Sequence, residues 1–339
     1  MIKSLRFWLG LGISLVMILW ALSQVDLGGL GRALVRTNYS YLLLCLPIIW
    51  LQYVVRALRW DYLLRPVAKV PYRSLLASTV VGFTGNLLLP ARLGEIMRAV
   101  DVGRREGISK ASALATILLE RVLDGLAVVP LFLLAAWSLG VFAGPSDMAG
   151  HTRTAATVFG LVYLGVLIVV VALSLNPRRS LALLGLILSP LPQKISAKLL
   201  GFASSIVAGL MLLRYPRLLV PALAYTLILW LMLAAPLYIL ALAVGHPVSF
   251  TAALFVNGLI CLAIAVPSAP GYVGTFHYAI QVGFGVLLGM SQEKALALAV
   301  IFHGVTFAFT VLYCLTFLVR GRVSLLDLGR TAEREQSGR

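Results

Sequence analysis

Long apolar segments recur along this chain from Phe7 to Val319, and short clusters of basic residues separate them. Hydrophobic residues make up 60% of the sequence and charged residues only 12%, and the mean hydropathy is +0.98. A water-soluble domain needs more polar surface than this composition provides, whereas a polytopic membrane protein requires such a composition. The sequence therefore predicts an all-α polytopic membrane protein, because helices satisfy their own backbone hydrogen bonds in lipid.

The net charge of +16 arises from 28 basic and 12 acidic residues. The basic residues lie between apolar segments, as they do in cytoplasmic loops that face anionic lipid headgroups. We therefore expect membrane lipids as partners and no nucleic acid. Cys45, Cys261 and Cys314 lie inside apolar segments and show neither a disulfide framework nor a metal-ligand spacing. The sequence predicts no metal and no cofactor.

The alternation of basic-rich and basic-poor connections predicts about six full transmembrane helices, with both termini in the cytoplasm. The first apolar run resembles a signal peptide at Ala21-Leu22-Ser23, but Trp8 and Trp20 near its ends favour an uncleaved span. The six expected spans are Phe7–Leu22, Tyr39–Val55, Ala111–Leu139, Thr154–Leu175, Leu218–Val244 and Ala295–Val319.

The remaining segments complete a single membrane domain over residues 1–322, followed by a polar cytoplasmic tail over 323–339. Residues 24–38 read as a short connector. Residues 176–216 contain apolar stretches broken by proline and glycine, and we expect them to lie along the cytoplasmic interface.

Two apolar segments do not fit this alternation. Ser74–Val102 has basic flanks on both sides and breaks at Pro90, whereas Phe250–Met290 starts and ends on the basic-poor side and breaks at 267–271. A segment that enters the membrane and returns to the same side satisfies both flanks, if its broken backbone faces protein or water. We predict two re-entrant hairpins that enter from opposite faces.

The two breaks share a short pattern of proline, two residues, an aliphatic residue and glycine. It reads Pro90-Ala91-Arg92-Leu93-Gly94 in the first hairpin and Pro270-Gly271-Tyr272-Val273-Gly274 in the second. Each hairpin precedes a span with a polar insertion, which is Glu120-Arg121 in one and His303 in the other. Opposed broken helices are typical of an inverted repeat around a translocation pathway. Two independent kinks are the alternative.

Charged side chains within apolar segments mark the candidate site. A charge near the bilayer centre costs about 2.5–3.5 kcal/mol, so such residues are paired or face a wet cavity. Arg92 and Arg121 are candidates to bind a lipid phosphate through charge-assisted, bidentate hydrogen bonds. The alternatives are a solvated turn for Arg92, Glu95 and Arg98, and a structural ion network for Glu120, Arg121 and Asp124.

Arg56 and Arg59 precede Trp60 and read as an interfacial anchor, with recruitment of lipid headgroups as a second role.

Three ordered motifs carry a resemblance to a known family: Asn86 with Pro90 to Glu95, Glu120-Arg121 with Asp124, and Pro267 to Gly274. Over nearly the whole chain they resemble the flippase-like membrane family that includes the transmembrane part of lysylphosphatidylglycerol synthases. The resemblance implies transport of an anionic or aminoacylated phospholipid, or of a lipid-linked intermediate, between leaflets of a bacterial or archaeal cytoplasmic membrane. The predicted substrate pathway comprises Asn86, Pro90, Arg92, Gly94, Glu95, Arg98, Glu120, Arg121, Asp124, Pro267, Pro270, Gly271, Gly274, His277 and His303.

The chain departs from the family pattern in two ways. No aminoacyl-transfer domain follows its last span, so we expect it not to be that synthase. His277 and His303 stand where many relatives carry an acidic residue and an arginine. A protonated histidine could substitute for that arginine, and helix packing is the alternative role.

Two other functions stay open. An integral-membrane headgroup or glycosyl transferase could use Glu95, Glu120 and Asp124 as acid, base or metal ligands, although the sequence contains no DxD-like pair and no phosphate-cradling glycine loop. The second open function is that of a non-transporting accessory subunit of envelope lipid synthesis. The protein partners to consider are a second copy of the chain and a separate lipid-synthesis enzyme.

Overall fold

The computed structural model describes residues 5–89, 93–141, 177–190, 215–265 and 268–321, together with single positions between 165 and 204. Within these ranges every regular element is helical, as predicted. Three helical segments are long and apolar enough to cross a membrane, and a bent pair of helices near the N-terminus would add a fourth. The prediction of a polytopic, all-α membrane protein is confirmed. The three segments are Tyr39–Leu64, Pro216–Ala243 and Gln292–Phe317.

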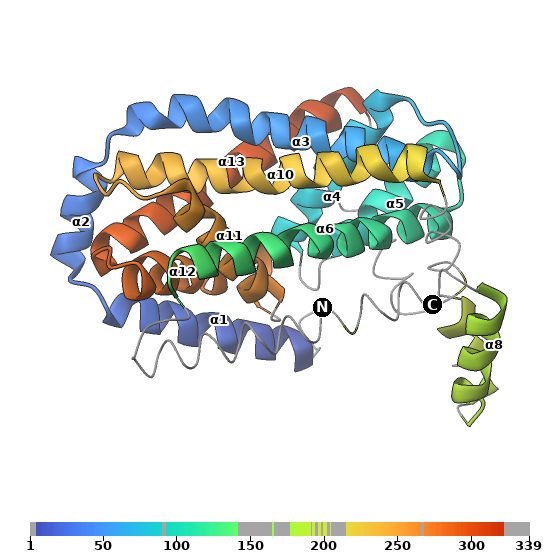
Figure 1. Cartoon of the computed structure of the whole chain (residues 1–339). Coiled ribbons are helices and arrows are strands. Elements are labelled where there is room, and N and C mark those ends of the chain that lie inside the picture. The colour runs from blue at the N-terminus through green and yellow to red at the C-terminus, as the bar shows by residue number, and fades with distance from the viewer. Residues whose placement is uncertain are drawn as a thin grey trace.

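Helices α3 (Leu42–Leu64) and α10 (Pro216–Ala243) run antiparallel along the length of the bundle (Figure 1). The side-chain amide of Gln52 donates a hydrogen bond to the carbonyl of Met232 at 2.9 Å, midway along this pair. At one end, the Asn38 amide donates to the carbonyl of Ala243 at 2.9 Å. The two helices therefore pack against each other along the length of the bundle.

The first predicted hairpin is formed by α4 (Tyr72–Leu88) and α5 (Leu93–Glu106), which pack closely against each other. Helix α4 ends just before Leu89, whose extended backbone is the conformation favoured before a proline. A Cβ atom at Gly82 would lie 2.9 Å from the carbonyl oxygen of Gly94, and a Cβ at Gly94 would overlap the carbonyl of Gly82. The glycines therefore allow the two helices to approach within backbone contact.

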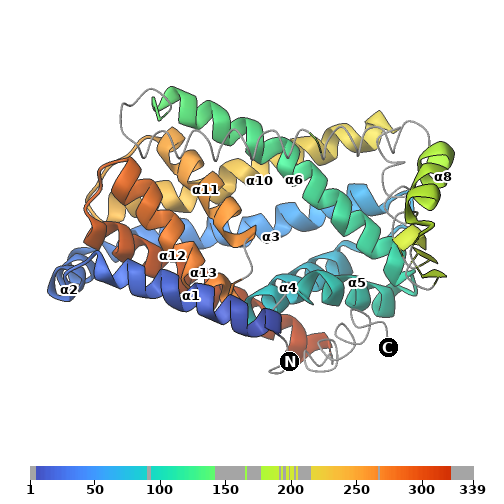
Figure 2. The ribbon, with the colours of Figure 1, turned by 90° about the horizontal axis from the view of Figure 1, so that it is seen from below.

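The second predicted hairpin begins with α11 (Phe250–Ala265) and returns through a short 3₁₀ turn η4 (Pro270–Tyr272), α12 (Thr275–Ile280) and the π-helix η5 (Gln281–Leu287). Gly271 and Gly274 have φ angles of +73° and +92° in the turn, which favour glycine. Figures 1 and 2 show that the two hairpins enter the bundle from opposite ends.

The C-terminal end of α4 meets the turn η4 inside the bundle. Helix α4 contacts η4, and a Cβ atom at Gly271 would lie 3.3 Å from the carbonyl oxygen of Leu87. Pro90, Arg92 and Pro267 lie outside the described residues.

Helices α6 (Lys110–Ser138) and α13 (Gln292–Gly321) follow the two hairpins. The order of packing is the same in both halves: α3 on α4, α4 on α5 and α5 on α6 in one, and α10 on α11, α11 on α12 and α12 on α13 in the other. The halves also exchange contacts, since α6 packs on α11 and α13 packs on α4.

The N-terminal region differs from one prediction. Helix α1 (Leu5–Ser23) forms where a span was expected, but residues 24–38 contain a further helix, α2 (Leu27–Arg36), instead of a connector. The carboxylate of Asp26 caps α2 by accepting hydrogen bonds from the amides of Gly28 and Gly29. Helix α2 is bent by 85° from α1 and packs on α13.

Helix α8 (Pro177–Leu188) lies within the predicted interfacial segment. The predicted span Thr154–Leu175, apart from position 165, and the tail 323–339 lie outside the described part of the chain.

Candidate functional site

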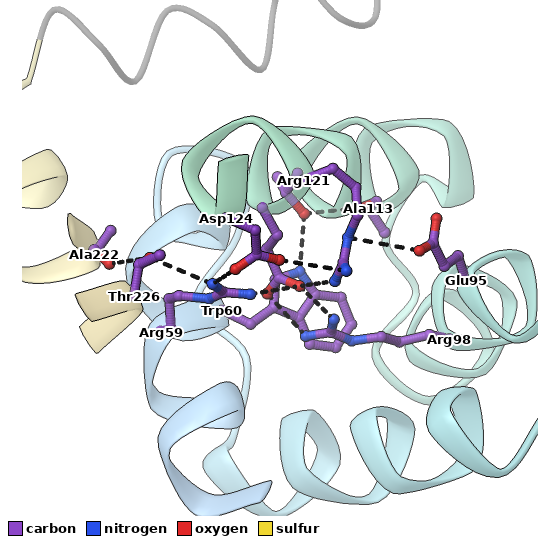
Figure 3. A network of polar contacts seen from close by, with 11 residues as sticks. Arg59, Trp60, Glu95, Arg98, Ala113, Arg121, Asp124, Ala222 and Thr226 are labelled. Atoms are coloured by element: carbon purple, nitrogen blue, oxygen red, sulfur yellow. Dashed lines mark hydrogen bonds and ion pairs between the residues drawn. The ribbon is translucent and has the colours of Figure 1, made fainter. Parts of the chain in front are cut away.

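Three helices, α3, α5 and α6, bring six charged side chains together inside the bundle (Figure 3). Three are arginines and three are carboxylates, so the group is formally neutral. We call this group the charge cluster; its members are Arg59, Glu95, Arg98, Glu120, Arg121 and Asp124.

Glu120 lies at the centre of the charge cluster and is 1% exposed. It stands about 15 Å along α6 from the first residue of that helix, at about 1.5 Å per residue. Arg98 makes a two-point contact with it: Nη1 to Oε2 is 2.6 Å, and Nη2 to Oε1 is 3.1 Å. Arg59 Nη2 lies 3.4 Å from the same Oε2. Two guanidinium groups therefore compensate one buried carboxylate.

Arg59 is fully buried, which corrects the prediction that it anchors the chain at the lipid interface. Its Nη1 donates a close hydrogen bond to Asp124 Oδ1 and lies 3.3 Å from the hydroxyl oxygen of Thr226. Two carboxylates compensate the charge of Arg59 inside the bundle. Its guanidinium therefore does not extend to the lipid headgroups. The guanidinium of Arg56 lies 4.2 Å from the ring centroid of Phe83 in α4 and is half-buried.

Arg121 contacts three carboxylates: Glu120 and Asp124, which the ion-network alternative grouped with it, and also Glu95. The separations are 3.5 Å from Nε to Glu95, 3.6 Å from Nη2 to Glu120 and 3.3 Å from Nη1 to Asp124. All three exceed the Arg98–Glu120 distances, and 35% of the Arg121 side chain is exposed. Arg121 is thus the most accessible arginine of the charge cluster, and its partners hold it more loosely.

Trp60 supports the charge cluster, a role that the sequence analysis missed. The guanidinium carbon of Arg98 lies 3.7 Å from the centroid of the Trp60 ring, within the range of a cation–π interaction. The indole donates a hydrogen bond to Thr116 at 2.9 Å, which fixes the ring. The one signal in the sequence is that Trp60 directly follows Arg59, and that pair also resembles an interfacial anchor.

The solvated-turn alternative does not describe Arg98, because this residue is 2% exposed. Asn86 lies on α4 of the same hairpin and faces Gly94 of α5, since a Cβ at Gly94 would lie 2.6 Å from its Oδ1 atom. That oxygen is buried and has no hydrogen-bond partner within the described residues. The last turn of α4 therefore carries a polar group that could accept a further hydrogen bond.

The histidines of the second hairpin form a separate group. His303 Nε2 lies 2.8 Å from the carbonyl oxygen of Gly271, and the rings of His277 and His303 are 5.0 Å apart. Gly274 lies against α1, since a Cβ there would be 2.6 Å from the carbonyl oxygen of Ser14. In the part of the chain described, no ion pair or hydrogen bond joins this group to the charge cluster. The structure does bring together His303 and the second break.

Metal coordination finds no support in these residues. Among the side chains that the structure places, no three of the types His, Cys, Asp and Glu converge to hold a metal ion. The carboxylates of the charge cluster are instead neutralised by arginines.

Comparison with known proteins gives one family match, described as the lysylphosphatidylglycerol synthase TM region, over residues 7–314. The chain is 28% identical over 280 residues to a protein named glycosyltransferase AglD from Haloferax volcanii, covering 76% of this chain and 45% of that protein. It is 25% identical over 319 residues to a UPF0104 membrane protein of Pyrococcus horikoshii, covering 88% of this chain and 90% of the relative.

A third relative is a UPF0104 membrane protein of Methanocaldococcus jannaschii, which is 27% identical over 126 residues, or 36% of this chain and 38% of the relative. The chain thus spans less than half the length of two of these three relatives. No solved structure gives a significant match.

Proposed function

Because this chain belongs to the family of the lysylphosphatidylglycerol synthase transmembrane region, we propose that it moves a lipid between membrane leaflets. The lipid is an anionic or aminoacylated phospholipid, or a lipid-linked intermediate. The observation that carries this proposal is Arg121, whose side chain is 35% exposed in an ion network that also contains the buried residues Arg59, Arg98, Glu120 and Asp124. Ionisable residues inside the membrane-spanning part of a protein are rare and commonly mark substrate or ion pathways.

The phosphate of the lipid engages Arg121 in this proposal. A guanidinium binds phosphate through two parallel hydrogen bonds, which are stronger than its present contacts of 3.3–3.6 Å. Arg59 and Arg98 keep their ion pairs with Glu120 and Asp124, and these pairs maintain the geometry of the site. Arg121 meanwhile exchanges its carboxylate partners for the phosphate.

The hairpins supply the path for the headgroup. We propose that both are re-entrant, that six full spans surround them and that both termini are cytoplasmic. The equivalent packing order of α3–α6 and α10–α13 supports an inverted repeat, in which broken helices from opposite faces meet at the pathway. The contact of Leu87 with Gly271 fits that arrangement.

A transferase acting on a lipid is the second candidate, and the name of the Haloferax volcanii relative favours it. Its chemistry would need a carboxylate free to act as acid, base or metal ligand. The carboxylates of the charge cluster are paired with arginines, which supports transport over transfer. An accessory subunit without transport activity is the third.

One assay separates these functions. The purified chain is reconstituted in liposomes that contain phosphatidylglycerol with a fluorescent acyl chain, and back-extraction by albumin reports the inner-leaflet fraction. The proposal predicts that the inner-leaflet probe becomes extractable faster than in protein-free liposomes, with the headgroup unchanged by mass spectrometry. A changed headgroup supports the transferase. If neither movement nor chemistry rises above the protein-free control with phosphatidylglycerol or an aminoacylated lipid, the accessory role replaces our proposal.

A further inference from the structure

Arg56 differs from the arginines of the charge cluster because no carboxylate described in the structure lies within ion-pairing distance of it. Its guanidinium carbon lies over the face of the Phe83 ring, 4.2 Å from the ring centroid. The side chain is half-buried and lies on α3 one turn before Arg59. A cation in a membrane-spanning helix is costly unless an anion or water compensates it. Arg56 therefore offers an open position for an anion.

Aromatic side chains extend away from Arg56 across three helices. The Tyr53 ring packs against Phe83 of α4 at 5.9 Å, and against Phe309 and Tyr313 of α13 at 6.4 and 5.7 Å. Tyr313 continues the series to Phe317 at 5.2 Å. We call these five side chains, Tyr53, Phe83, Phe309, Tyr313 and Phe317, the aromatic lane.

The aromatic lane borders the lipid-facing surface. Phe309, Tyr313 and Phe317 recur at every fourth residue of α13 and so lie on one face of that helix. All three are half-buried, and the neighbouring Leu312 and Leu315 are 62% and 47% exposed. A hydrocarbon chain that leaves the bilayer can thus reach the lane from the side of α13.

Polar contacts fix the inner wall of the lane. The hydroxyl groups of Tyr53 and Thr310 share a hydrogen bond of 2.6 Å, and the Thr84 hydroxyl lies 3.4 Å from the Thr310 carbonyl oxygen. These contacts join α3, α4 and α13. The Tyr53 ring, which contacts three of the other rings, is therefore held in place without a ligand, as in a preformed binding surface.

We propose that Arg56 and the aromatic lane form an entry site for a phospholipid, which holds the lipid phosphate on Arg56 and one hydrocarbon chain on the rings. Charge complementarity selects the occupant, because no carboxylate among the described residues forms an ion pair with this guanidinium and its planar fork suits a phosphate. The aromatic faces supply the apolar surface that free phosphate could not use. The site rests on the proposed lipid transport, since it would deliver the phosphate to Arg121.

Binding of phosphatidylglycerol to the detergent-purified full chain tests the site, with native mass spectrometry as the readout. Arg56→Gln should weaken the tightest-bound lipid at least tenfold, while dioleoylglycerol, which lacks a phosphate, should bind the variant and the parent equally. Arg65→Gln is the matched control: Arg65 also lies over a ring, that of Tyr62 at 4.1 Å, but it is already paired with Asp61 at 2.6 Å. Its lipid affinity should stay parental.

Two results would overturn the entry site. One is parental affinity of Arg56→Gln for phosphatidylglycerol, and the other is displacement of the lipid by millimolar inorganic phosphate, which would indicate a free-phosphate site. If Arg56→Gln does not fold, the parental chain is labelled instead with phosphatidylglycerol that carries a diazirine in its acyl chain. Labelling concentrated at Phe83, Phe309 and Tyr313 supports the site, whereas equal labelling of the exposed Leu134 and Trp137 contradicts it.

The binding result is independent of transport. If the parental chain moves lipid and Arg56→Gln binds lipid as tightly as the parent, the entry site would be contradicted and the proposed function would stand. If lipid binding depends on Arg56 but the chain moves no lipid, the result would support the entry site and contradict the proposed transport.

Discussion

Arg98 of α5 and Glu120 of α6 form a two-point ion pair, with Nη1–Oε2 and Nη2–Oε1 distances of 2.6 and 3.1 Å. The pair joins the first hairpin to the helix that follows it, and Trp60 of α3 covers the guanidinium. Both charges are buried, so each depends on the other for compensation. The charge cluster therefore combines a fixed part, around Glu120, with an accessible part, at Arg121.

Glu120→Gln should be strongly destabilising. The change removes the negative charge that compensates Arg98 and Arg59, and breaking a buried ion pair from one side costs about 3–5 kcal/mol. Thermal unfolding in detergent measures the effect. Glu95→Gln is the control, because Glu95 is 21% exposed and its ion pair with Arg121 is 3.5 Å long. Equal loss of stability in the two variants would contradict the central role of Glu120.

Gly94→Ala should disrupt the first hairpin. The new Cβ would overlap the carbonyl oxygen of Gly82, a backbone atom that cannot move without separating α4 from α5. We expect loss of monodisperse protein in size-exclusion chromatography, or a large decrease in the unfolding temperature. Gly304→Ala in α13 is the matched control, since nothing lies within 4 Å of its new Cβ. A Gly94→Ala protein as stable as Gly304→Ala would show that the close approach is not required.

The hairpins were predictable because their signals are local. Proline and glycine at 90–94 and 270–274 interrupt apolar segments, and the charge of the flanking loops favours a hairpin over a simple crossing. The pairing of Arg121 with Asp124 could also be predicted from the sequence, because Asp124 lies one helical turn after Arg121.

Two other features could not be read from the sequence. The pairing of Arg59 with Asp124 spans 65 positions and depends on how α3 packs against α6, and an arginine before a tryptophan resembles an interfacial anchor equally well. Helix α2 was missed because Gly28, Gly29 and Gly31 lower its helix propensity by about 1 kcal/mol each. The Asp26 cap and packing on α13 favour the helix nonetheless.

The proposed topology predicts the side from which two exposed positions react. Position 104, at the end of α5, and position 291, before α13, are both exposed and should lie on opposite sides of the membrane. Single cysteines are placed there in a chain whose three native cysteines have been replaced. A membrane-impermeant maleimide should label position 104 from the cytoplasmic side only and position 291 from the outer side only. Labelling of both positions from one side would exclude opposed re-entrant hairpins.

Arg121→Lys should slow lipid transport at least tenfold while the unfolding temperature stays near parental. Lysine keeps the charge that Glu95, Glu120 and Asp124 compensate, but it loses the planar fork that binds a phosphate through two hydrogen bonds. The liposome assay with fluorescent phosphatidylglycerol measures the rate, and differential scanning fluorimetry measures stability.

Arg105→Lys provides the matched control for Arg121→Lys, because Arg105 pairs with Asp101 at 2.9 Å on α5 and lies outside the charge cluster. Its transport rate should remain parental, which would show that exchanging an ion-paired arginine for lysine is tolerated elsewhere. Should Arg121→Lys transport lipid at the parental rate, or should it unfold while Arg105→Lys does not, Arg121 would be a structural member of the ion network. The phosphate contact would then have to come from another residue of the pathway.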